Sequence, residues 1–322
     1  MVISTGRLTV TSRTLAVCCE GFPALATGRG AGTPLATMRA NRVVSVTPAA
    51  RSEGVQPGMR RREAQAHCPE LEIVASDESR DARAFEQVMA VLDAVAPRWE
   101  VTEAGRCAVP VRGPSRLFGG DRAVALRVHA EVSTALERFG GGDPGVSSGA
   151  TTAQPVGVAV ADGPGAAAAL AEQAAGDALA SPAVPVASPA WPVTATPEGH
   201  GVSGAGSRGI CMVAPGATAT HLERMPTRLL LRGGPSWAPR EEVTQLVDVL
   251  ERLGLVTLGR FARLERTDVL ARFGRCGMLA HALARGAETS QVSLEDLPVD
   301  TGVSACFDPP AELVDQVGFM AK

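Results

Sequence analysis

Two short stretches of the sequence raise the question of whether they belong to a metal-dependent site. Residues 14–22 read TLAVCCEGF, and residues 99–120 read WEVTEAGRCAVPVRGPSRLFGG. The first predicts a buried strand, and the second a strand, a turn and a strand-like end. Enzymes that transfer nucleotides hold two metal ions with carboxylates on such strands. The centre of the second stretch is instead Gly105-Arg106, so it is either an active-site strand without its acids or simply a strand.

Cysteine and histidine do not form a metal-binding pattern in this sequence. Of the seven cysteines, Cys18 and Cys19 are adjacent, no two are spaced as CxxC, and the five histidines are scattered. A structural zinc site is therefore not expected, and reduced thiols are the simplest interpretation. Nothing near Cys18 in the sequence supplies a base, so we expect buried strand thiols rather than redox chemistry.

The charge balance limits the classes of function. The net charge of −3 argues against a generally basic nucleic-acid-binding protein. Lys322 is the only lysine, tyrosine is absent, and arginine carries almost all of the positive charge. Arginine suits phosphate recognition. Alanine, glycine and proline are raised as well, which favours the codon bias of a GC-rich genome as the cause.

Length and hydropathy point to a multi-domain protein outside the membrane. A chain of 322 residues exceeds one ordinary hydrophobic core, so two or three units are expected. No run approaches 18 apolar residues, and no membrane span is expected. The N-terminal residues lack the apolar core and cleavage site of a signal peptide, so we expect a cytoplasmic protein.

Strand and helix patterns are mixed over residues 12–180 and predict an α/β or α+β unit. Further short apolar runs predict strands at 42–47, 71–76 and 156–161. Helices are expected at 49–54, 58–67 and 166–180, and after caps at Asp81 and Asp121. The inner faces of the two capped helices are predicted to be Phe85, Val88, Leu92 and Val95, and Ala125, Val128, Val132 and Leu136.

The C-terminal half is predicted to be a linker followed by helices. Residues 181–208 are rich in proline, glycine and serine, which predicts a loop or linker. From residue 236 the pattern turns helical, and a second helix is expected to be capped near Thr267 and to stop at Gly274. The apolar stripe of the first helix is predicted to be Val243, Leu246, Val247 and Leu250.

The segment LGLVTLG joins these helices, and its two glycines, Gly254 and Gly259, bracket a tight turn. It resembles a helix-hairpin-helix, in which hairpin N–H groups meet a DNA phosphate without needing side-chain charge. The alternative is an αα-hairpin that needs glycine for steric reasons.

Four segments in this order resemble a Y-family (UmuC/DinB-type translesion) DNA polymerase. They are RANRVVSVTPAARSEGVQPGMRRREAQAHCPELEIV, EVT…VPVRGPSRLFGG, VAVADGPGAAAALA and LERLGLVTLGRFARL. The resemblance is closer to the catalytically inactive ImuB subgroup, a polymerase-like accessory subunit of bacterial damage-induced mutagenesis. It covers residues 13–322, and GVQPGMRRREAQAHCPEL and RLFGG are its most specific parts.

The resemblance implies a polymerase domain order. Residues 12–180 would form an α+β palm with fingers inserted at about 30–75. Residues 181–235 would be a loop and connection, and residues 236–290 an all-α helix-hairpin-helix thumb. Residues 300–322 would begin a truncated little-finger domain, most of which is absent.

The same resemblance places the catalytic slots on residues that do not bind metal. The first Asp slot falls at Cys18, the neighbouring acid slot near Glu20, and the Asp-Glu slot at Gly105-Arg106. A fixed arginine charge there would repel Mg²⁺. Moving a carboxylate by two residues, as Glu103 would require, displaces it by about 6–7 Å along a strand, against a metal–oxygen bond of about 2 Å. We therefore expect no bound metal or other cofactor.

The nucleotide-binding slots are incomplete by the same comparison. Arg51 fits an arginine that grips the triphosphate, while Pro48 stands in the accompanying tyrosine slot, and no basic residue occupies the palm lysine slot. Arg51 could bind a phosphate or make a local ion pair. Arg60 and Arg61, with Arg62, are candidates for template contact or a solvated surface. The candidate hairpin contacts to DNA are Gly254, Val256, Leu258 and Gly259.

Two classes of function are consistent with these residues. The first is a non-catalytic protein that binds damaged primer-template DNA and acts as an accessory scaffold in translesion synthesis. The resemblance implies a sliding clamp, an error-prone replicative-type polymerase and a RecA-like accessory protein as partners, although no glutamine-plus-hydrophobic clamp motif follows the thumb. The alternative is a low-activity, Mg²⁺-dependent translesion polymerase with rearranged ligands. An unrelated α/β protein with a helical appendage would be a third interpretation.

Overall fold

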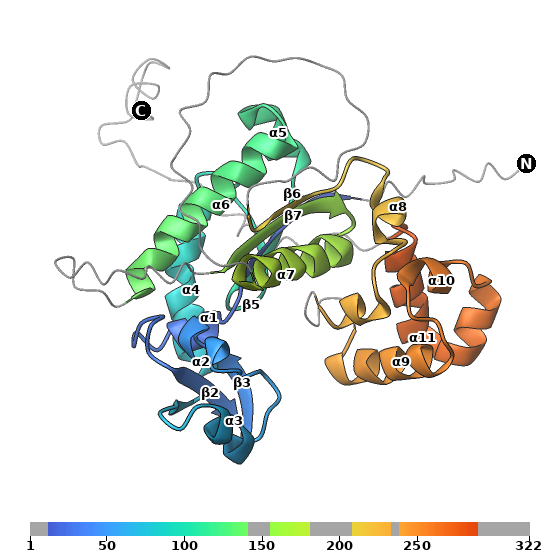
Figure 1. The fold of residues 1–322 in the computed structure, drawn as a ribbon. Helices are drawn as coiled ribbons and strands as arrows, with labels where there is room; N and C mark the ends of the chain where they lie inside the picture. The colour runs from blue at the N-terminus through green and yellow to red at the C-terminus, as the bar shows by residue number, and fades with distance from the viewer. Residues whose placement is uncertain (1–11, 141–154, 181–207, 233–237, 289–322) are drawn as a thin grey trace, which may run out of the picture.

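A five-stranded mixed sheet forms the centre of the protein (Figure 1). The computed structural model describes residues 12–140, 155–180, 208–232 and 238–288. The strand order is β5-β6-β1-β7-β8, with β1 antiparallel to both β6 and β7, and β8 parallel to β7. The strands are β1 (Arg13–Cys19), β5 (Glu100–Glu103), β6 (Arg106–Pro110), β7 (Val156–Asp162) and β8 (Ile210–Met212).

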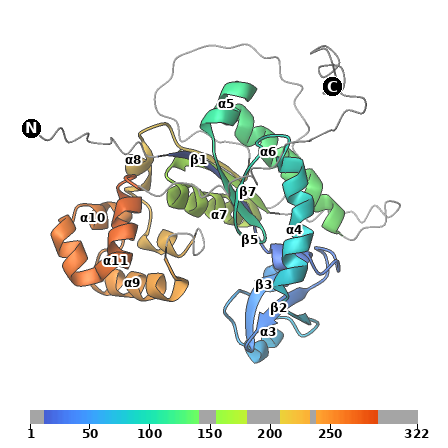
Figure 2. The same ribbon diagram turned by 180° about the vertical axis from the view of Figure 1, so that it is seen from behind.

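Both faces of this sheet are covered by helices. Leu15 and Val17 of β1 belong to a buried cluster with residues of α4 (Glu78–Leu92) and α6 (Asp121–Glu137). Figure 2 shows these two helices from behind. Alternate residues of β1, including Cys18, point into a second cluster under α7 (Pro164–Ala180). This burial on both sides explains why β1 is a continuous apolar run rather than an alternating one.

Close contact between α7 and the sheet depends on small residues. A Cβ on Gly157 would overlap the carbonyl oxygen of Ala171 and lie 2.6 Å from the amide nitrogen of Ala175. Only glycine therefore lets α7 approach β7 at this point. The alanine-rich composition of α7 is a consequence of that short distance, since larger side chains would lift the helix off the sheet.

The fingers are a separate small unit between β1 and β5 in the sequence. Its sheet has the order β3-β2-β4, and its own core includes Val43, Val46 and Leu71. It confirms the predicted strands near 42–47 and 71–76, whereas β2 was not predicted. Its elements are β2 (Leu35–Arg39), β3 (Arg42–Val46), β4 (Glu72–Ala75), α2 (Pro48–Ser52) and α3 (Arg61–His67), with α1 (Phe22–Leu25) leading into it from β1.

A helical unit packs beside α7. It contains α8 (Thr218–Leu222), the 3₁₀ segment η2 (Thr227–Leu231), α9 (Arg240–Arg252), α10 (Leu258–Ala262) and α11 (Arg266–Ala284). The predicted stripe of α9 is buried at all four positions. The helix stops at Gly274, as predicted, because that residue has the non-helical angles φ 59° and ψ −151°. A second helical stretch follows the kink within α11 and runs to Ala284, with Cys276, Ala280 and Leu283 on its buried face.

Several local predictions are corrected by the structure. The palm does not end at residue 180, because β8, inside the expected connection 181–235, joins the central sheet beside β7. The side chain that caps α4 is Asp77 rather than Asp81, and Gly120, not Asp121, holds the cap position of α6. The strand-like end expected after β6 is instead the helix α5 (Arg112–Phe118), and η1 (Arg138–Gly140) follows α6.

The predicted inner faces of α4 and α6 are confirmed, since all eight side chains are buried, with Val95 lying just beyond the end of α4. Residues 181–207 and 300–322, expected as a linker and the start of a little finger, lie outside the described residues. Within the described parts of the chain, no helix is long and apolar enough to cross a membrane.

Candidate active site

The turn between β5 and β6 fixes the residues in the expected Asp-Glu slot. Gly105 adopts φ +95°, and a Cβ there would lie 2.7 Å from Cβ of Phe22. Its carbonyl oxygen accepts the Cys19 amide at 2.8 Å. Because a side chain at position 105 would be strained and would clash, this slot cannot carry a carboxylate in the present turn.

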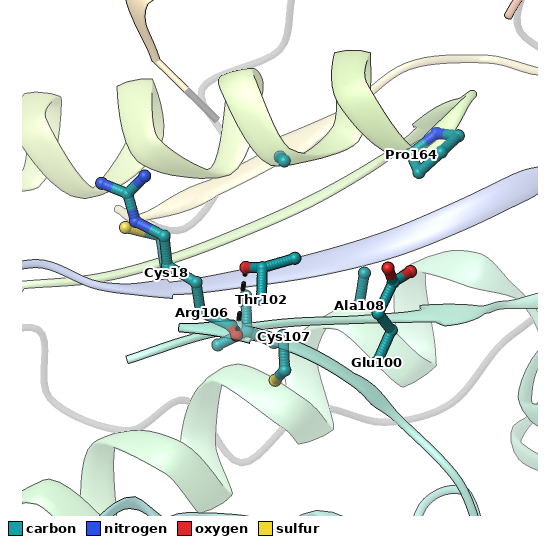
Figure 3. Close-up of a pocket in the computed structure, with 9 residues that line it drawn as sticks. Cys18, Glu100, Thr102, Arg106, Cys107, Ala108 and Pro164 are labelled. Carbon is teal, nitrogen blue, oxygen red and sulfur yellow. Dashed lines mark hydrogen bonds between the residues drawn. The ribbon is translucent and has the colours of Figure 1, made fainter. Parts of the chain in front are cut away.

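Arg106 begins β6 directly opposite Cys18 of β1. Its Nε lies 3.0 Å from Glu103 Oε1 and its Nη2 lies 2.8 Å from Glu172 Oε2 of α7, while only 18% of the side chain is exposed. Figure 3 shows the guanidinium directed toward the helix that begins at Pro164. A fixed cation with two carboxylate partners therefore occupies the place where metal ligands were expected.

The charge of Arg106 is stabilised by its surroundings. Burial acts against the charged form, but the surrounding negative charges, which include the Glu172 and Glu103 carboxylates, outweigh it and raise the pKa of Arg106 above its usual value. Nη1 is buried without a hydrogen-bond partner among the described residues. The positive charge of this buried guanidinium would repel a second cation placed beside it.

Cys18 does not offer a thiolate. It is 2% exposed, and burial raises its pKa well above the usual value, partly opposed by Arg106. The neighbouring Cys19 and Cys107 thiols also have pKa values raised by burial. All three are therefore neutral, buried strand thiols at physiological pH, as their sequence context predicted.

Glu20 occupies the remaining acid slot and is held by the fingers. Arg51 of α2 places Nη2 at 2.5 Å from Glu20 Oε1, and both side chains are less than one-third exposed. Of the two roles left open for Arg51, a phosphate contact or a local ion pair, this structure contains the ion pair. Any phosphate that used Arg51 would have to displace Glu20.

The surrounding carboxylates do not assemble into a metal centre. A pocket between β5, β6 and α7 contains Glu100 and Thr102 beside Arg106, and its other lining residues are mostly apolar (Figure 3). Glu103 and Glu172 are both bound to Arg106. In the described ranges, no group of three or more His, Cys, Asp or Glu residues could hold a metal ion. The residues present therefore do not fit the two-metal chemistry of the alternative function.

A cluster of exposed arginines lies on the fingers. Arg60 is the N-cap residue of α3, and its backbone forms an isolated antiparallel β-bridge with that of Arg42. Arg61 and Arg62 follow Arg60 in the sequence. All four side chains are exposed, and none is ion-paired within the part of the chain that the structure describes. Arg42 was not predicted, because its proximity to α3 depends on the fold of the fingers sheet. The exposed Arg60, Arg61 and Arg62 side chains can reach phosphates, whereas Arg42 Nη1 donates to Gly58 O at 2.8 Å and would have to leave that contact.

The α9–α10 hairpin only partly fits the predicted DNA contact. Gly254 and Val256 are exposed at its tip. Leu258 is fully buried and donates its amide to Met225 O at 2.9 Å, while the Gly259 amide donates to Glu223 O at 3.0 Å. A Cβ on Gly259 would lie 2.6 Å from that same oxygen. The prediction is therefore wrong for Leu258 and Gly259, and Gly259 has the steric role that was the alternative.

Other hairpin amides are also used internally. The Gly254 and Leu255 amides donate to carbonyls of α9. What the tip can offer a phosphate is instead side-chain charge, from the exposed Arg252 and Arg260 on either side of the turn. Neither arginine was predicted, although Arg252 directly precedes the LGLVTLG segment and Arg260 directly follows it.

Comparisons with known proteins agree with this architecture. Residues 24–138 match the family model described as the impB/mucB/samB family. Comparison with curated proteins finds no match. Among solved structures, a ternary complex of Dbh with partially disordered substrates has a TM-score of 0.57 at 15% identity, covering 87% of this chain and 68% of that chain. DinB from Sulfolobus solfataricus has a TM-score of 0.58 at 16% identity, covering 87% of this chain and 69% of that chain.

These matches confirm the resemblance to Y-family polymerases but do not test the ImuB subgroup or the truncation. The identities are low, so the solved structures establish a shared fold. The chain contains a region similar to the impB/mucB/samB family, within a mixed α+β fold that resembles the palm and fingers of Y-family polymerases.

Proposed function

We propose that this chain is a non-catalytic, polymerase-shaped protein that binds damaged primer-template DNA and acts as an accessory scaffold in translesion synthesis. The observation that carries the proposal is the buried Arg106 guanidinium, bound to Glu103 and Glu172 in the slot where the fold needs metal-binding carboxylates. The first slot holds the neutral thiol of Cys18. Neither the Cys18 thiol nor the Arg106 guanidinium supplies the carboxylate that a metal ion would need, and the guanidinium also adds a competing positive charge.

DNA binding is supported by where the exposed arginines lie. Arg42, Arg60, Arg61 and Arg62 cover one edge of the fingers, and Arg252 and Arg260 flank the tip of the helical unit. In Figure 1 these two units lie on opposite sides of α7. Because the net charge is −3, we expect modest affinity that rests on these local contacts and falls with salt.

The wider role follows the resemblance to the ImuB subgroup. A sliding clamp, an error-prone replicative-type polymerase and a RecA-like accessory protein are the proposed protein partners, in the cytoplasm and as part of damage-induced mutagenesis. A protein that holds DNA without extending it would need such a polymerase to complete synthesis.

The test combines two readouts in one reaction. Purified protein is mixed at low salt with labelled primer-template, all four deoxynucleotides and Mg²⁺ or Mn²⁺, and both mobility shift and primer extension are scored. A shift without extension supports the proposal. Extension that chelation abolishes, and that a mock preparation lacks, would establish the polymerase alternative. Absence of any shift down to the lowest salt would overturn the DNA-binding role.

A further inference from the structure

Glu288 is a buried carboxylate outside the candidate active site. Only 6% of it is exposed, four residues beyond the end of α11. Oε1 accepts the Gly165 amide at 3.0 Å and Oε2 accepts the Ala166 amide at 2.9 Å. These amides belong to the first turn of α7 and have no partner within the helix. The carboxylate therefore joins the end of the helical unit to the start of the helix that covers the sheet.

The chain is built to hold Glu288 in this position. The Gly286 amide donates to Leu283 O and the Ala287 amide donates to Ala282 O, and Gly286 has φ 57°. This pair of bonds ends α11 in a Schellman motif and fixes the direction of the residue that follows. On the receiving side, a Cβ on Gly163 would overlap Oε2, and one on Gly165 would lie 2.5 Å from Oε1.

We propose that Glu288 is a positioning residue, a latch that fixes the helical unit in one orientation on α7. Among the described residues, Arg232 Nη1, directly after η2, also donates to Glu172 O of α7 at 3.1 Å, and the rest of the contact includes the apolar cluster of Leu170 with Leu229 and Leu230. Apolar contacts are non-directional and tolerate small displacements, whereas two hydrogen bonds to fixed amides do not. The latch therefore sets how the arginines of the helical unit stand relative to those of the fingers.

Docking of the latch is linked to proton uptake. Burial raises the pKa of Glu288 from 4.5 to about 7, although the Ala166 and Gly165 amides act in the opposite direction. No charged side chain of the described residues contributes to this shift. The groups that face the carboxylate are glycine and backbone from the start of α7, and Leu283 from α11.

The sign of this linkage follows from the two pKa values. The docked carboxyl binds a proton more tightly than an undocked one, so docking is most favourable below about pH 4.5. It weakens as the pH rises to about 7 and is then constant. We therefore expect the latch to loosen progressively between about pH 4.5 and 7.

Hydrogen exchange of the full chain tests this inference at the amides involved. Protection of the first turn of α7, corrected for intrinsic exchange, should fall on the order of tenfold in the wild type between pH 5.5 and 8.5. Glu288→Gln, which cannot ionise, should remove this dependence. Glu241→Gln, the same change at an exposed position of α9, should keep it. Equal pH dependence in wild type and Glu288→Gln would overturn the latch.

A size exchange provides an independent test. Gly165→Ala introduces a Cβ that displaces the carboxylate but suits the helical backbone, so it should lower protection at all pH values. In a Glu288→Ala background the same change meets no carboxylate and should have little further effect. Additive effects of the two substitutions would show that the residues do not act on each other.

Discussion

Cys18 and Arg106 are direct partners across β1 and β6, so a neutral thiol and a cation lie side by side in the central sheet. The local charge is balanced internally, because Glu103 and Glu172 bind the guanidinium. The sheet thus keeps a positive charge at this point without depending on metal or substrate.

The first prediction concerns the stability supplied by this cation. Arg106→Ala should lower the free energy of unfolding by roughly 2–4 kcal/mol at pH 7, because the mostly buried Glu172 loses its guanidinium partner. Urea unfolding followed by circular dichroism measures the loss. Arg228→Ala breaks the pair with Glu251 at an exposed site and should leave the midpoint nearly unchanged. Equal losses for both variants would contradict a structural role for Arg106.

The second prediction concerns the ion pair that occupies Arg51. Glu20→Gln should release Arg51 and strengthen deoxynucleotide triphosphate binding by up to about tenfold, since a charge-assisted phosphate contact becomes available. Competition titration with a fluorescent nucleotide measures the change. Glu53→Gln, two residues beyond Arg51 and exposed, should have no effect. Unchanged binding in Glu20→Gln would show that Arg51 is purely structural.

Local patterns in the sequence predicted much of the core but not its long-range contacts. The inner faces of α4, α6 and α9 follow from helical spacing, and β1 and β7 from apolar runs. The partner of Arg106, Glu172, lies in an alanine-rich helix far along the chain, and no local signal relates the two. The role of Glu288 could not be predicted from the sequence either, because it depends on the close contact of its carboxylate with Gly163 and Gly165.

The strand β8 was missed for a different reason. It has only three residues, and it joins the sheet through parallel pairing with β7 across a segment rich in proline, glycine and serine. Three residues are too few to show a strand periodicity, and the segment becomes a strand by pairing with the edge of β7. The hairpin glycines show the same limit, because one pattern fits both a phosphate contact and a steric requirement.

The third prediction concerns DNA binding by the fingers. Replacing both Arg60 and Arg61 by alanine should weaken DNA binding similarly across sequences, and should reduce the slope of log K against log salt by up to about 2, as expected for two lost phosphate contacts. Fluorescence anisotropy at several salt concentrations measures both values. Arg116 and Arg122, exposed on α5 and α6, provide a matched double replacement that should leave the slope unchanged. The fingers surface would be excluded if the two double variants behaved alike.

The last prediction separates the two roles of glycine in the α9–α10 hairpin. Gly259→Ala should destabilise the helical unit, because the new Cβ would lie 2.6 Å from Glu223 O, a backbone atom that also accepts the residue-259 amide. Gly254→Ala has open space around it and should lose only about 1 kcal/mol from its positive φ. Thermal unfolding ranks the two variants. DNA affinity measured well below the transition should then be unchanged in Gly259→Ala, since Gly259 faces the protein interior. A loss of affinity with normal stability would restore Gly259 as a phosphate contact.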